Sequence, residues 1–237
     1  MTGAGEVVYG RNPVRELLAA GRRPVREVWA LPQLGGEPWL AAATVRSRDR
    51  AALARACGTG DHQGVVAFTG PYPYVPPRSV LEAGGPVACL DGAQDPRNLG
   101  AISRVADAAG AGGLVIAARG SPGVTAVVCK ASAGAVEHLA IARAESIAGF
   151  LQEARDAGRQ VVGADPEGGV AYTSAHVAAD AVIVLGSEGA GLRPRVARAC
   201  DVLVAIPMRG RVASLNISVA AGLLLFEAGR GLAGRAS

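Results

Sequence analysis

The stretch VLVAIPMRGRVASLNISVAAGLLLFE, from Val202 to Glu227, decides the fold of this chain. Its first residues, Val202 to Ile206, are an apolar run rich in β-branched side chains, which predicts a buried strand. Pro207 ends that strand because proline has no N–H to donate to a sheet. A short basic loop leads to a helix-length apolar run from Ile217 to Phe226. Loops between a strand end and a helix bind ligands in open α/β sheets, although many bind nothing.

The composition of the chain is that of a globular protein with a mild positive charge. Its 237 residues are enough for one large or two small domains, and half of them are hydrophobic, so a sizeable core can form. The net charge is +4, and Lys130 is the only lysine among the 24 basic residues. The excess of arginine is compatible with a nucleic-acid partner, but it is equally typical of a GC-rich coding sequence.

The cysteines and the apolar runs argue against several classes of protein. No two of the four cysteines form a CxxC pair, and no cysteine–histidine cluster has metal-site spacing, so we expect no metal. Cys89 and Cys200 lie in or beside apolar runs, which indicates small buried side chains. The N-terminus has no secretory pattern, and the longest apolar run, Val219 to Phe226, is too short to span a bilayer. We therefore expect a cytoplasmic protein without a membrane partner.

Residues 1–70 predict a small α/β domain. Asn12 before Pro13 is typical of a helix start, and Gly21 is typical of a helix end. The segment from Thr44 to Ala56 carries four arginines: Arg46, Arg48, Arg50 and Arg55. These arginines indicate either the solvated face of a helix or a patch that contacts RNA phosphates, and the residues alone leave both interpretations open.

Residues 71–85 are rich in proline and glycine, which predicts a stiff linker without regular structure. From residue 86 to residue 237, apolar runs of strand length alternate with helical segments. The expected strands are 87–90, 114–117, 161–164, 182–185 and 202–206, and the expected helices include 99–109 and 147–157. This alternation predicts a mostly parallel sheet that is covered on both faces.

A first motif, LDGAQDPRNLGAISRVADAAGAGGLVI, runs from Leu90 to Ile116. A strand ends in it, a Gly/Pro loop follows, and Asn98 occupies the expected N-cap of a helix. Arg104 falls within the first two turns of that helix. Taken alone, Asn98 is more typical of a helix cap and Arg104 of a surface charge than of a catalytic site.

A second motif, IVLGSEGAGLRPRV, runs from Ile183 to Val196. Gly186, Gly189 and Gly191 let the backbone turn sharply and approach a ligand closely. Their spacing matches neither the dinucleotide fingerprint nor the phosphate-binding loop, so it does not by itself indicate a nucleotide site. Glu188 alone is explained by the favourable position of a negative charge at a helix N-terminus.

These two motifs and the stretch from Val202 to Glu227 resemble, in the same order, the three motifs of the SpoU (TrmH) family of RNA ribose 2'-O-methyltransferases. The resemblance implies that Asn98 and Arg104 belong to an active site and that Glu188 is the acid of the second motif. It also implies that the turn containing Gly186 and Gly191 helps to hold S-adenosylmethionine.

The third motif supplies further residues that the resemblance places at the cofactor. Ile206, Pro207, Met208 and Leu215 would surround its adenosine and methionine parts, whereas Ser214 and Asn216 would orient the ribose and the loops. Apolar walls with a few polar groups are what an adenine pocket requires, although Met208 could equally fill a gap in the core.

The resemblance also carries expectations about fold and assembly. It implies a SPOUT-type α/β fold with a deep trefoil knot at the C-terminal end of the catalytic domain, 86–237. It implies a homodimer with the two sites near the subunit interface. The N-terminal sequence VVYGRNPVRELLAAGRRPVREVWA is similar to the RNA substrate-binding extension of the subgroup that methylates large-subunit ribosomal RNA.

The expected reaction is transfer of a methyl group from S-adenosylmethionine to a ribose 2'-hydroxyl, with a guanosine of 23S ribosomal RNA as the first expectation. The alternatives are a tRNA guanosine, a ribosomal adenosine methylated in antibiotic resistance, and an RNA-binding protein that has lost turnover. Because arginine has a pKa of about 12.5 or higher, we expect Arg104 to stabilise a developing alkoxide. Arg104 could act as a base only if its site strongly depressed that pKa.

Overall fold

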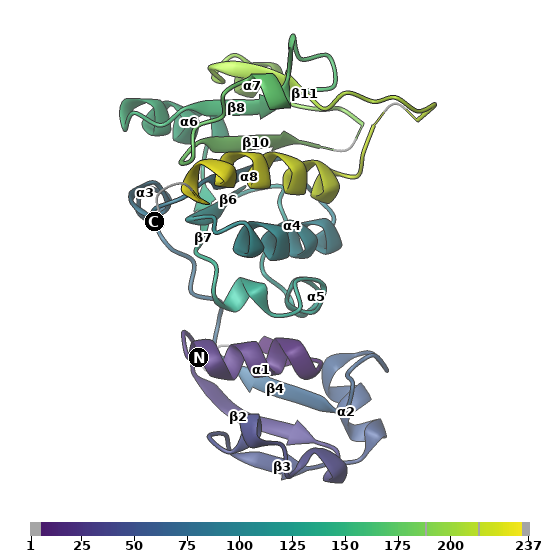
Figure 1. Cartoon of the computed structure of the whole chain (residues 1–237). Coiled ribbons are helices and arrows are strands. Elements are labelled where there is room, and N and C mark those ends of the chain that lie inside the picture. The colour runs from purple at the N-terminus through teal and green to yellow at the C-terminus, as the bar shows by residue number, and fades with distance from the viewer. Residues whose placement is uncertain (1–5, 188, 213, 234–237) are drawn as a thin grey trace. The chain divides into compact units, whose positions relative to one another are not determined.

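The computed structural model describes residues 6–187, 189–212 and 214–233, with side chains described as far as Arg230 (Figure 1). The chain divides into two compact units. The first contains Met1–Pro73 and Gly123–His138, and the second contains Tyr74–Pro122 and Leu139–Ser237. The sequence did not predict that the internal segment Gly123–His138 groups with the N-terminal residues.

The first unit is a small α/β unit, as expected. Its sheet has the order β1-β4-β2-β3, in which only the β2–β3 pair is parallel. Its strands are β1 (Glu6–Tyr9), β2 (Val25–Ala30), β3 (Val45–Ser47) and β4 (Val65–Thr69). Its helices are α1 (Arg11–Ala20), α2 (Arg50–Cys57) and α5 (Ala126–Ala131), with 3₁₀ turns at Pro32–Leu34, Pro38–Leu40 and Ala135–Glu137.

The start of α1 differs from the prediction. The helix begins at Arg11 behind Gly10, which has a φ of 98° and supplies no side-chain cap, so Asn12 is not the N-cap. Pro13 is still tolerated because the N–H groups of the first turn have no partner within the helix. The helix end is confirmed, since Gly21 adopts the left-handed conformation and its N–H donates to the carbonyl of Leu17.

A buried ion pair binds the segment Gly123–His138 to the N-terminal residues. The side chains of Arg23 and Glu137 are each 1% exposed and pair with one another. Arg23 Nη1 also donates to Glu6 Oε2 at 2.8 Å, and the Tyr72 hydroxyl donates to the carbonyl of Val136 at 2.7 Å. Removing one partner of such a pair leaves an uncompensated buried charge, which typically costs about 3–5 kcal/mol.

The four arginines of the N-terminal cluster lie in two settings. Arg50 and Arg55 are exposed on α2, as a solvated helix face would be. Arg46 pairs with Glu27 at 2.7 Å, and the guanidinium of Arg48 lies 5.0 Å from the ring centre of Trp29. Arg50 and Arg55 therefore fit a solvated helix face, whereas Arg46 and Arg48 contact side chains of β2.

The second unit contains a seven-stranded sheet in which every pairing is parallel, so the predicted parallel sheet is confirmed. Its order is β7-β6-β5-β10-β8-β11-β9. The strands are β5 (Val87–Asp91), β6 (Gly113–Ala117), β7 (Ile141–Ala144), β8 (Val161–Ala164), β9 (Val170–Ala171), β10 (Val182–Gly186) and β11 (Val202–Ala205). The helices are α3 (Pro77–Glu82), α4 (Pro96–Ala108), α6 (Ile147–Asp156), α7 (Pro194–Ala197) and α8 (Ile217–Ala233), with a 3₁₀ turn at Tyr172–Ser174.

Helices cover both faces of this sheet (Figure 1). Successive residues of each strand point to opposite sides, so an apolar strand has two apolar faces that helices can bury. Val87, Cys89 and Val184 share a core cluster with α3, α6 and α7. Helices α4 and α8 pack against each other, and α8 also packs on β5 and β10. Burial raises the pKa of the Cys200 thiol to about 12, so this thiol stays neutral. The trefoil knot stays a prediction of the resemblance.

The proline-rich segment contains regular structure, which corrects the prediction for residues 71–85. Helix α3 begins at Pro77, directly after Pro76, and Val80 is buried. Proline is compatible with the first helical position because its fixed φ suits a helix and its missing N–H would have no partner there. The run of prolines therefore starts a short helix instead of excluding one.

The start of α4 is a second correction. Asp95 is the N-cap, and its side chain accepts from the N–H of Arg97 at 2.8 Å. The helix begins at Pro96, so Asn98 is its third residue, and Arg104 is its ninth, beyond the first two turns. Asp and Asn are nearly equal as caps, and the proline after Asp95 favours Asp95 because proline suits the first helical position.

Candidate active site

Two cavities open where the central strands of the second unit end. The first has a volume of about 540 Å³ and the second of about 550 Å³, and both are lined by Ser187 and Ile217. From β5 the chain continues to β6 and β7 on one side, whereas β10 and β8 lie on the other side. Ligands of open α/β sheets bind at such a reversal of strand order, outside the carboxyl ends of the strands.

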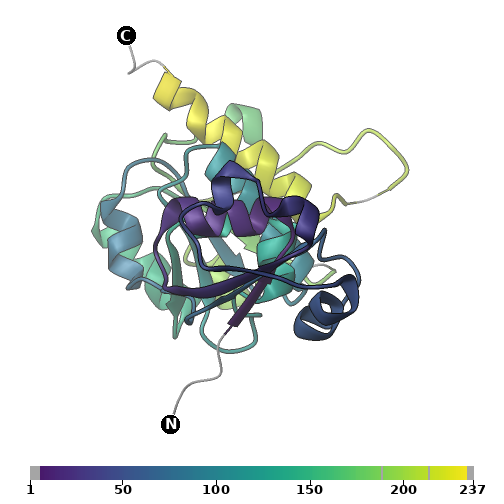
Figure 2. The ribbon, with the colours of Figure 1, turned by 90° about the horizontal axis from the view of Figure 1, so that it is seen from below.

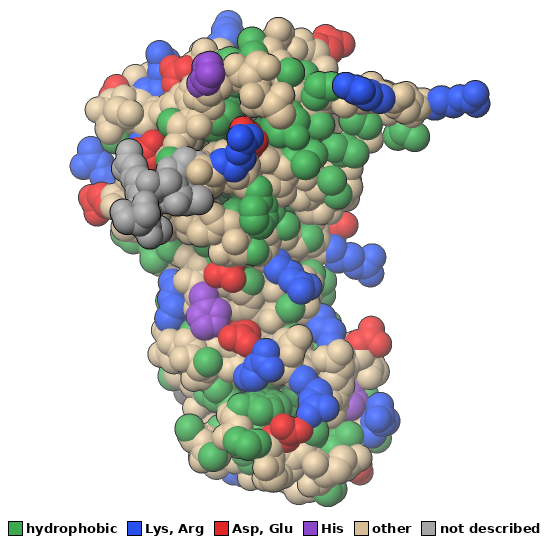
Figure 3. Space-filling view, in the orientation of Figure 1, with side chains coloured by type: hydrophobic (Ala, Val, Ile, Leu, Met, Phe, Trp, Pro, Cys, Tyr) green, Lys and Arg blue, Asp and Glu red, His purple; other side chains and the backbone are tan. Residues whose placement is uncertain are grey.

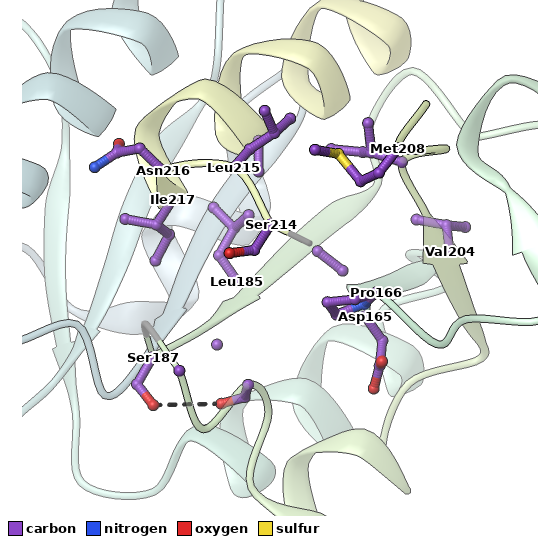
Figure 4. Close-up of a pocket in the computed structure, with 16 residues that line it drawn as sticks. Asp165, Pro166, Leu185, Ser187, Val204, Met208, Ser214, Leu215, Asn216 and Ile217 are labelled. Atoms are coloured by element: carbon purple, nitrogen blue, oxygen red, sulfur yellow. Dashed lines mark hydrogen bonds between the residues drawn. The ribbon is translucent and has the colours of Figure 1, made fainter. Parts of the chain in front are cut away.

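The first cavity is formed by loops after three strands and by the start of α8 (Figure 4). Ser187 lies across the cavity from Met208 and Leu215. Most of its walls are apolar: Ala164, Pro166, Leu185, Val204, Ile206, Met208, Leu215, Ile217 and Ala220. Asp165, Ser187, Ser214 and Asn216 are the polar side chains of the lining. A pocket of this size with few polar groups fits a flat heterocyclic base and a short polar tail.

The glycine turn after β10 closes one side of the first cavity. The backbones of Ser187 and Gly191 exchange two hydrogen bonds of 3.0 Å, and the Ser187 hydroxyl also lies 3.5 Å from the carbonyl of Gly191. Gly189 and Gly191 have φ values of 85° and 65°, which glycine adopts without strain. A Cβ on Gly186 would overlap the backbone of Gly191 and Leu192. The turn therefore requires glycine at position 186.

The segment Pro207–Val212 projects from the sheet beside the first cavity (Figure 2). Met208 lines the cavity and is 38% exposed, whereas Pro207 is exposed and is not part of the lining. Arg209 and Arg211 are exposed, and Figure 3 shows basic side chains along this projection. The expected contact of Pro207 with a cofactor thus has no counterpart in the cavity wall.

A hydrogen bond joins the first and third motifs at the boundary of the two cavities. Asn216 Nδ2 donates to Asn98 Oδ1 at 3.1 Å, and Asn216 Oδ1 accepts from the backbone N–H and the hydroxyl of Ser218. Asn216 thereby caps α8. Because Asn216 lines the first cavity and Asn98 lines the second, this contact links their walls.

The second cavity is polar and lies beyond the ends of β5 and β6. Its lining includes Asp91, Gln94, Asp95, Asn98, Arg119 and Arg193. Asp91 has no exposed side-chain surface, and its Oδ1 accepts from Arg193 Nε at 2.7 Å. Arg119 is 92% exposed and lies 3.7 Å from Glu145. The charged groups of this cavity suit a polar, anionic ligand better than an apolar one.

The predicted site residues are only partly brought together. Seven of them line the first cavity: Gly186, Gly191, Ile206, Met208, Ser214, Leu215 and Asn216. Asn98 lines the second. Glu188 lies outside the described residues. Arg104 is exposed on α4 and lines neither cavity, and its side chain makes no hydrogen bond or ion pair with any residue that the structure describes.

Several lining residues were missed by sequence reasoning. Ala164 is the last residue of β8 and is followed by Asp165 and Pro166, and Asp91 is the last residue of β5; both strands were predicted. The rule that ligands bind beyond strand ends would have selected them. No local signal marks Arg193, because its role depends on a contact with a residue 102 positions away.

The residues that the structure describes contain neither a grouped set of metal ligands nor a membrane-spanning helix. Among those residues, no three histidine, cysteine, aspartate or glutamate side chains are grouped as metal ligands would be. None of the described helices is both long enough and apolar enough to cross a bilayer.

Two family descriptions match the chain. Residues 86–226 match the SpoU rRNA Methylase family, and residues 7–75 match the family of RNA 2'-O ribose methyltransferase substrate binding regions. The first match contains all the strands whose ends form the two cavities.

Relatives and solved structures are similar over most of the chain. An uncharacterized tRNA/rRNA methyltransferase of Mycobacterium avium is 40% identical, over 95% of this chain and 77% of the relative. The AdoMet-bound rRNA methyltransferase of Sinorhizobium meliloti is 30% identical, with a TM-score of 0.81 over 97% of this chain and 88% of that one. The SpoU methyltransferase AviRb of Streptomyces viridochromogenes, in complex with AdoMet, is 26% identical, with the same TM-score over 97% and 91% of the chains.

Proposed function

Because the chain belongs to the SpoU rRNA Methylase family, we propose that it methylates the ribose 2'-hydroxyl of a guanosine in 23S ribosomal RNA, in the cytoplasm. The chain is an RNA methyltransferase that uses S-adenosylmethionine. The observation that carries the proposal is the pair of adjacent cavities, one apolar and one polar, that share Ser187 and Ile217. Methyl transfer needs the donor and the acceptor in contact. Two cavities that share lining residues would hold the two molecules side by side.

The first cavity fits S-adenosylmethionine. Leu185, Ile206 and Leu215 offer apolar surface for an adenine, and the glycine turn lets the backbone approach the ligand closely. When bound there, S-adenosylmethionine supplies an electrophilic methyl group on its sulfonium sulfur. Loss of the methyl group turns the sulfonium into a neutral thioether, so the leaving group needs no acid. The residues of the chain then have to orient the ribose and stabilise its oxygen as the proton departs to solvent.

The second cavity is our candidate for the acceptor nucleotide. Asn98 and Asn216 stand at the boundary of the two cavities, hydrogen-bonded to one another, so they are placed to orient a ribose between them. Ser214 lines the first cavity and would help to hold the loop. We assign Glu188, by its place in the second motif, to the same supporting network.

Arg104 needs a different explanation, because it lines neither cavity of its own chain. It lies six residues after Asn98 on α4, which is roughly 9 Å along the helix. We propose that the enzyme is a homodimer in which Arg104 enters the site of the partner subunit. There its guanidinium would stabilise the developing alkoxide and hold a neighbouring phosphate.

An apolar stripe on α8 supports the dimer. Val219, Leu223 and Phe226 are 50%, 37% and 53% exposed, and their spacing places them on one side of the helix. Figure 3 shows hydrophobic side chains on the surface over α8. Helix α4, which carries Arg104, packs beside α8. Exposed apolar side chains grouped in this way mark association surfaces.

Mixing two inactive variants tests the shared site. Arg104→Ala and Gly186→Val would each be inactive as homodimers. If Arg104 serves the partner's site, a heterodimer has one complete site, and a random mixture should recover about a quarter of wild-type activity. If Arg104 acts within its own chain, no subunit in the mixture has both groups, and activity stays absent. Size-exclusion chromatography of Phe226→Glu tests the interface, with a shift to monomer expected.

The choice of RNA is tested by methyl transfer from radiolabelled S-adenosylmethionine to separated 23S ribosomal RNA, 16S ribosomal RNA and tRNA. We expect label in 23S RNA, recovered as 2'-O-methylguanosine after digestion to nucleosides. Label in tRNA would establish the first alternative, and label in a ribosomal adenosine would establish the second. Binding of 23S RNA with no transfer to any fraction would mean a protein that has kept the fold and lost turnover.

A further inference from the structure

One arginine of the second cavity is held along its inner edge by a buried carboxylate. Asp91 Oδ1 accepts from Arg193 Nε at 2.7 Å and lies 2.5 Å from Nη2. Asp91 has no exposed side-chain surface, whereas the Arg193 side chain is 63% exposed. The buried carboxylate therefore orients one edge of the guanidinium, while much of the Arg193 side chain stays exposed to solvent.

Both carboxylates of this cavity, Asp91 and Asp95, accept hydrogen bonds from other groups of the protein. Asp91 is paired with Arg193, and Asp95 accepts from the N–H of Arg97 at the start of α4. By contrast, Arg193 keeps an outer edge, because its contacts with Asp91 use only Nε and Nη2. Arg119, the second arginine of the lining, is almost fully exposed and lies 3.7 Å from Glu145.

From this geometry, and resting on the proposed function, we infer that Arg193 binds a backbone phosphate of the RNA beside the acceptor nucleotide. Asp91 is the positioning residue that orients it. Guanidinium groups bind phosphate oxygens through two parallel N–H bonds, and the outer edge of Arg193 offers that fork. An arginine that is already oriented loses less conformational freedom when it binds a phosphate.

A backbone hydrogen bond allows phosphate binding by the Arg193 side chain to be tested apart from its structural role. The N–H of Arg193 donates to Asp91 Oδ2 at 2.9 Å, so the end of the glycine turn stays attached to β5 when the side chain is shortened. Arg193→Lys keeps a positive charge near the buried carboxylate but loses the planar fork. Arg193 is the N-cap of α7, and Arg195 is exposed on that helix and lines neither cavity, so Arg195→Ala is a matched control.

The experiment measures filter binding of transcribed 23S ribosomal RNA to the full-length protein over a range of salt concentrations. For Arg193→Ala we expect affinity about tenfold weaker and a log–log salt slope about 0.7 smaller, as for the loss of one phosphate contact. Arg193→Lys should fall between Ala and wild type. Calorimetric affinity for S-adenosylmethionine should stay near wild type, which shows that the variant is folded. The thermal midpoint of Arg193→Ala should fall, because the buried Asp91 loses its charged partner. Arg195→Ala should change none of these quantities.

Each other outcome overturns the inference. An unchanged salt slope for Arg193→Ala would mean that no phosphate is bound there. Weaker S-adenosylmethionine binding with an unchanged slope would assign Arg193 to the carboxylate of the cofactor. An equal effect of Arg195→Ala would reveal general charge attraction. Because RNA binding is measured without turnover, an inactive wild-type protein would refute the proposed function and still leave this test valid.

Discussion

The two cavities share a wall but differ in what forms them. The first is built from apolar side chains and a tight backbone turn at Gly186–Gly191, whereas the second is lined by charged and amide side chains, among them Asp91 and Arg193. Backbone turns and apolar walls recognise a molecule by shape, whereas charged side chains attract an anion. Under the proposed function, cofactor affinity and RNA affinity depend on separate sets of residues, and substitutions test that separation.

The largest expected effect is that of Gly186→Val. Its side chain would overlap the backbone of Gly191, so the turn cannot form and both calorimetric S-adenosylmethionine binding and turnover should be lost. RNA binding should persist. The control is Gly210→Val, because a Cβ on Gly210 meets no described atom within 4 Å. Unchanged cofactor affinity in Gly186→Val would remove the turn from the cofactor site.

Arg104→Ala should lower kcat by roughly 10²- to 10³-fold, because it removes the charge that we propose stabilises the transition state. S-adenosylmethionine affinity should stay within twofold of wild type, since Arg104 does not line the first cavity. Single-turnover kinetics and calorimetry measure the two quantities. A wild-type rate would contradict the catalytic assignment of Arg104.

Leu215→Ala sharpens the comparison on the apolar side. Leu215 lines the first cavity and is 37% exposed, so truncation should weaken S-adenosylmethionine binding about tenfold through lost apolar contact. The affinity for RNA should not change. Val127→Ala, at a residue 41% exposed in the first unit, is the control. A loss of RNA affinity without a loss of cofactor affinity would reverse the assignment of the two cavities.

The smallest expected effect is at the boundary. Asn98→Ala removes a partly exposed hydrogen bond to Asn216, which is worth about 1 kcal/mol, and should reduce kcat/KM about fivefold. If the two amides act as a pair, Asn216→Ala should cost about as much, and the double variant little more than either alone. Additive losses would mean that the two residues work independently.

The sequence predicted the second unit well because buried parallel strands are short apolar runs. The strands 182–186 and 202–205 start where they were expected and end within one residue of the prediction. The cavity residues Gly186, Met208 and Leu215 were also predicted, because the motifs that contain them are contiguous. Local sequence was less decisive at helix starts, where Asp95, and not Asn98, is the cap of α4.

What the sequence could not predict depends on contacts between distant residues. The Arg23–Glu137 pair joins residues 114 positions apart, and it explains why an internal segment groups with the N-terminal unit. The Asp91–Arg193 contact spans 102 positions. Arg104 is identified by its motif, but its distance from both cavities emerges only when α4 is placed in the fold.

A crystal structure of this chain with S-adenosylmethionine bound would test the division of the two cavities most directly. We expect the adenine to lie among Leu185, Ile206 and Leu215, with the methyl group pointing to the wall formed by Ser187 and Ile217. A cofactor that lies in the cavity of Arg119 and Arg193, or a methyl group that points away from that wall, would contradict the proposed division of the two cavities.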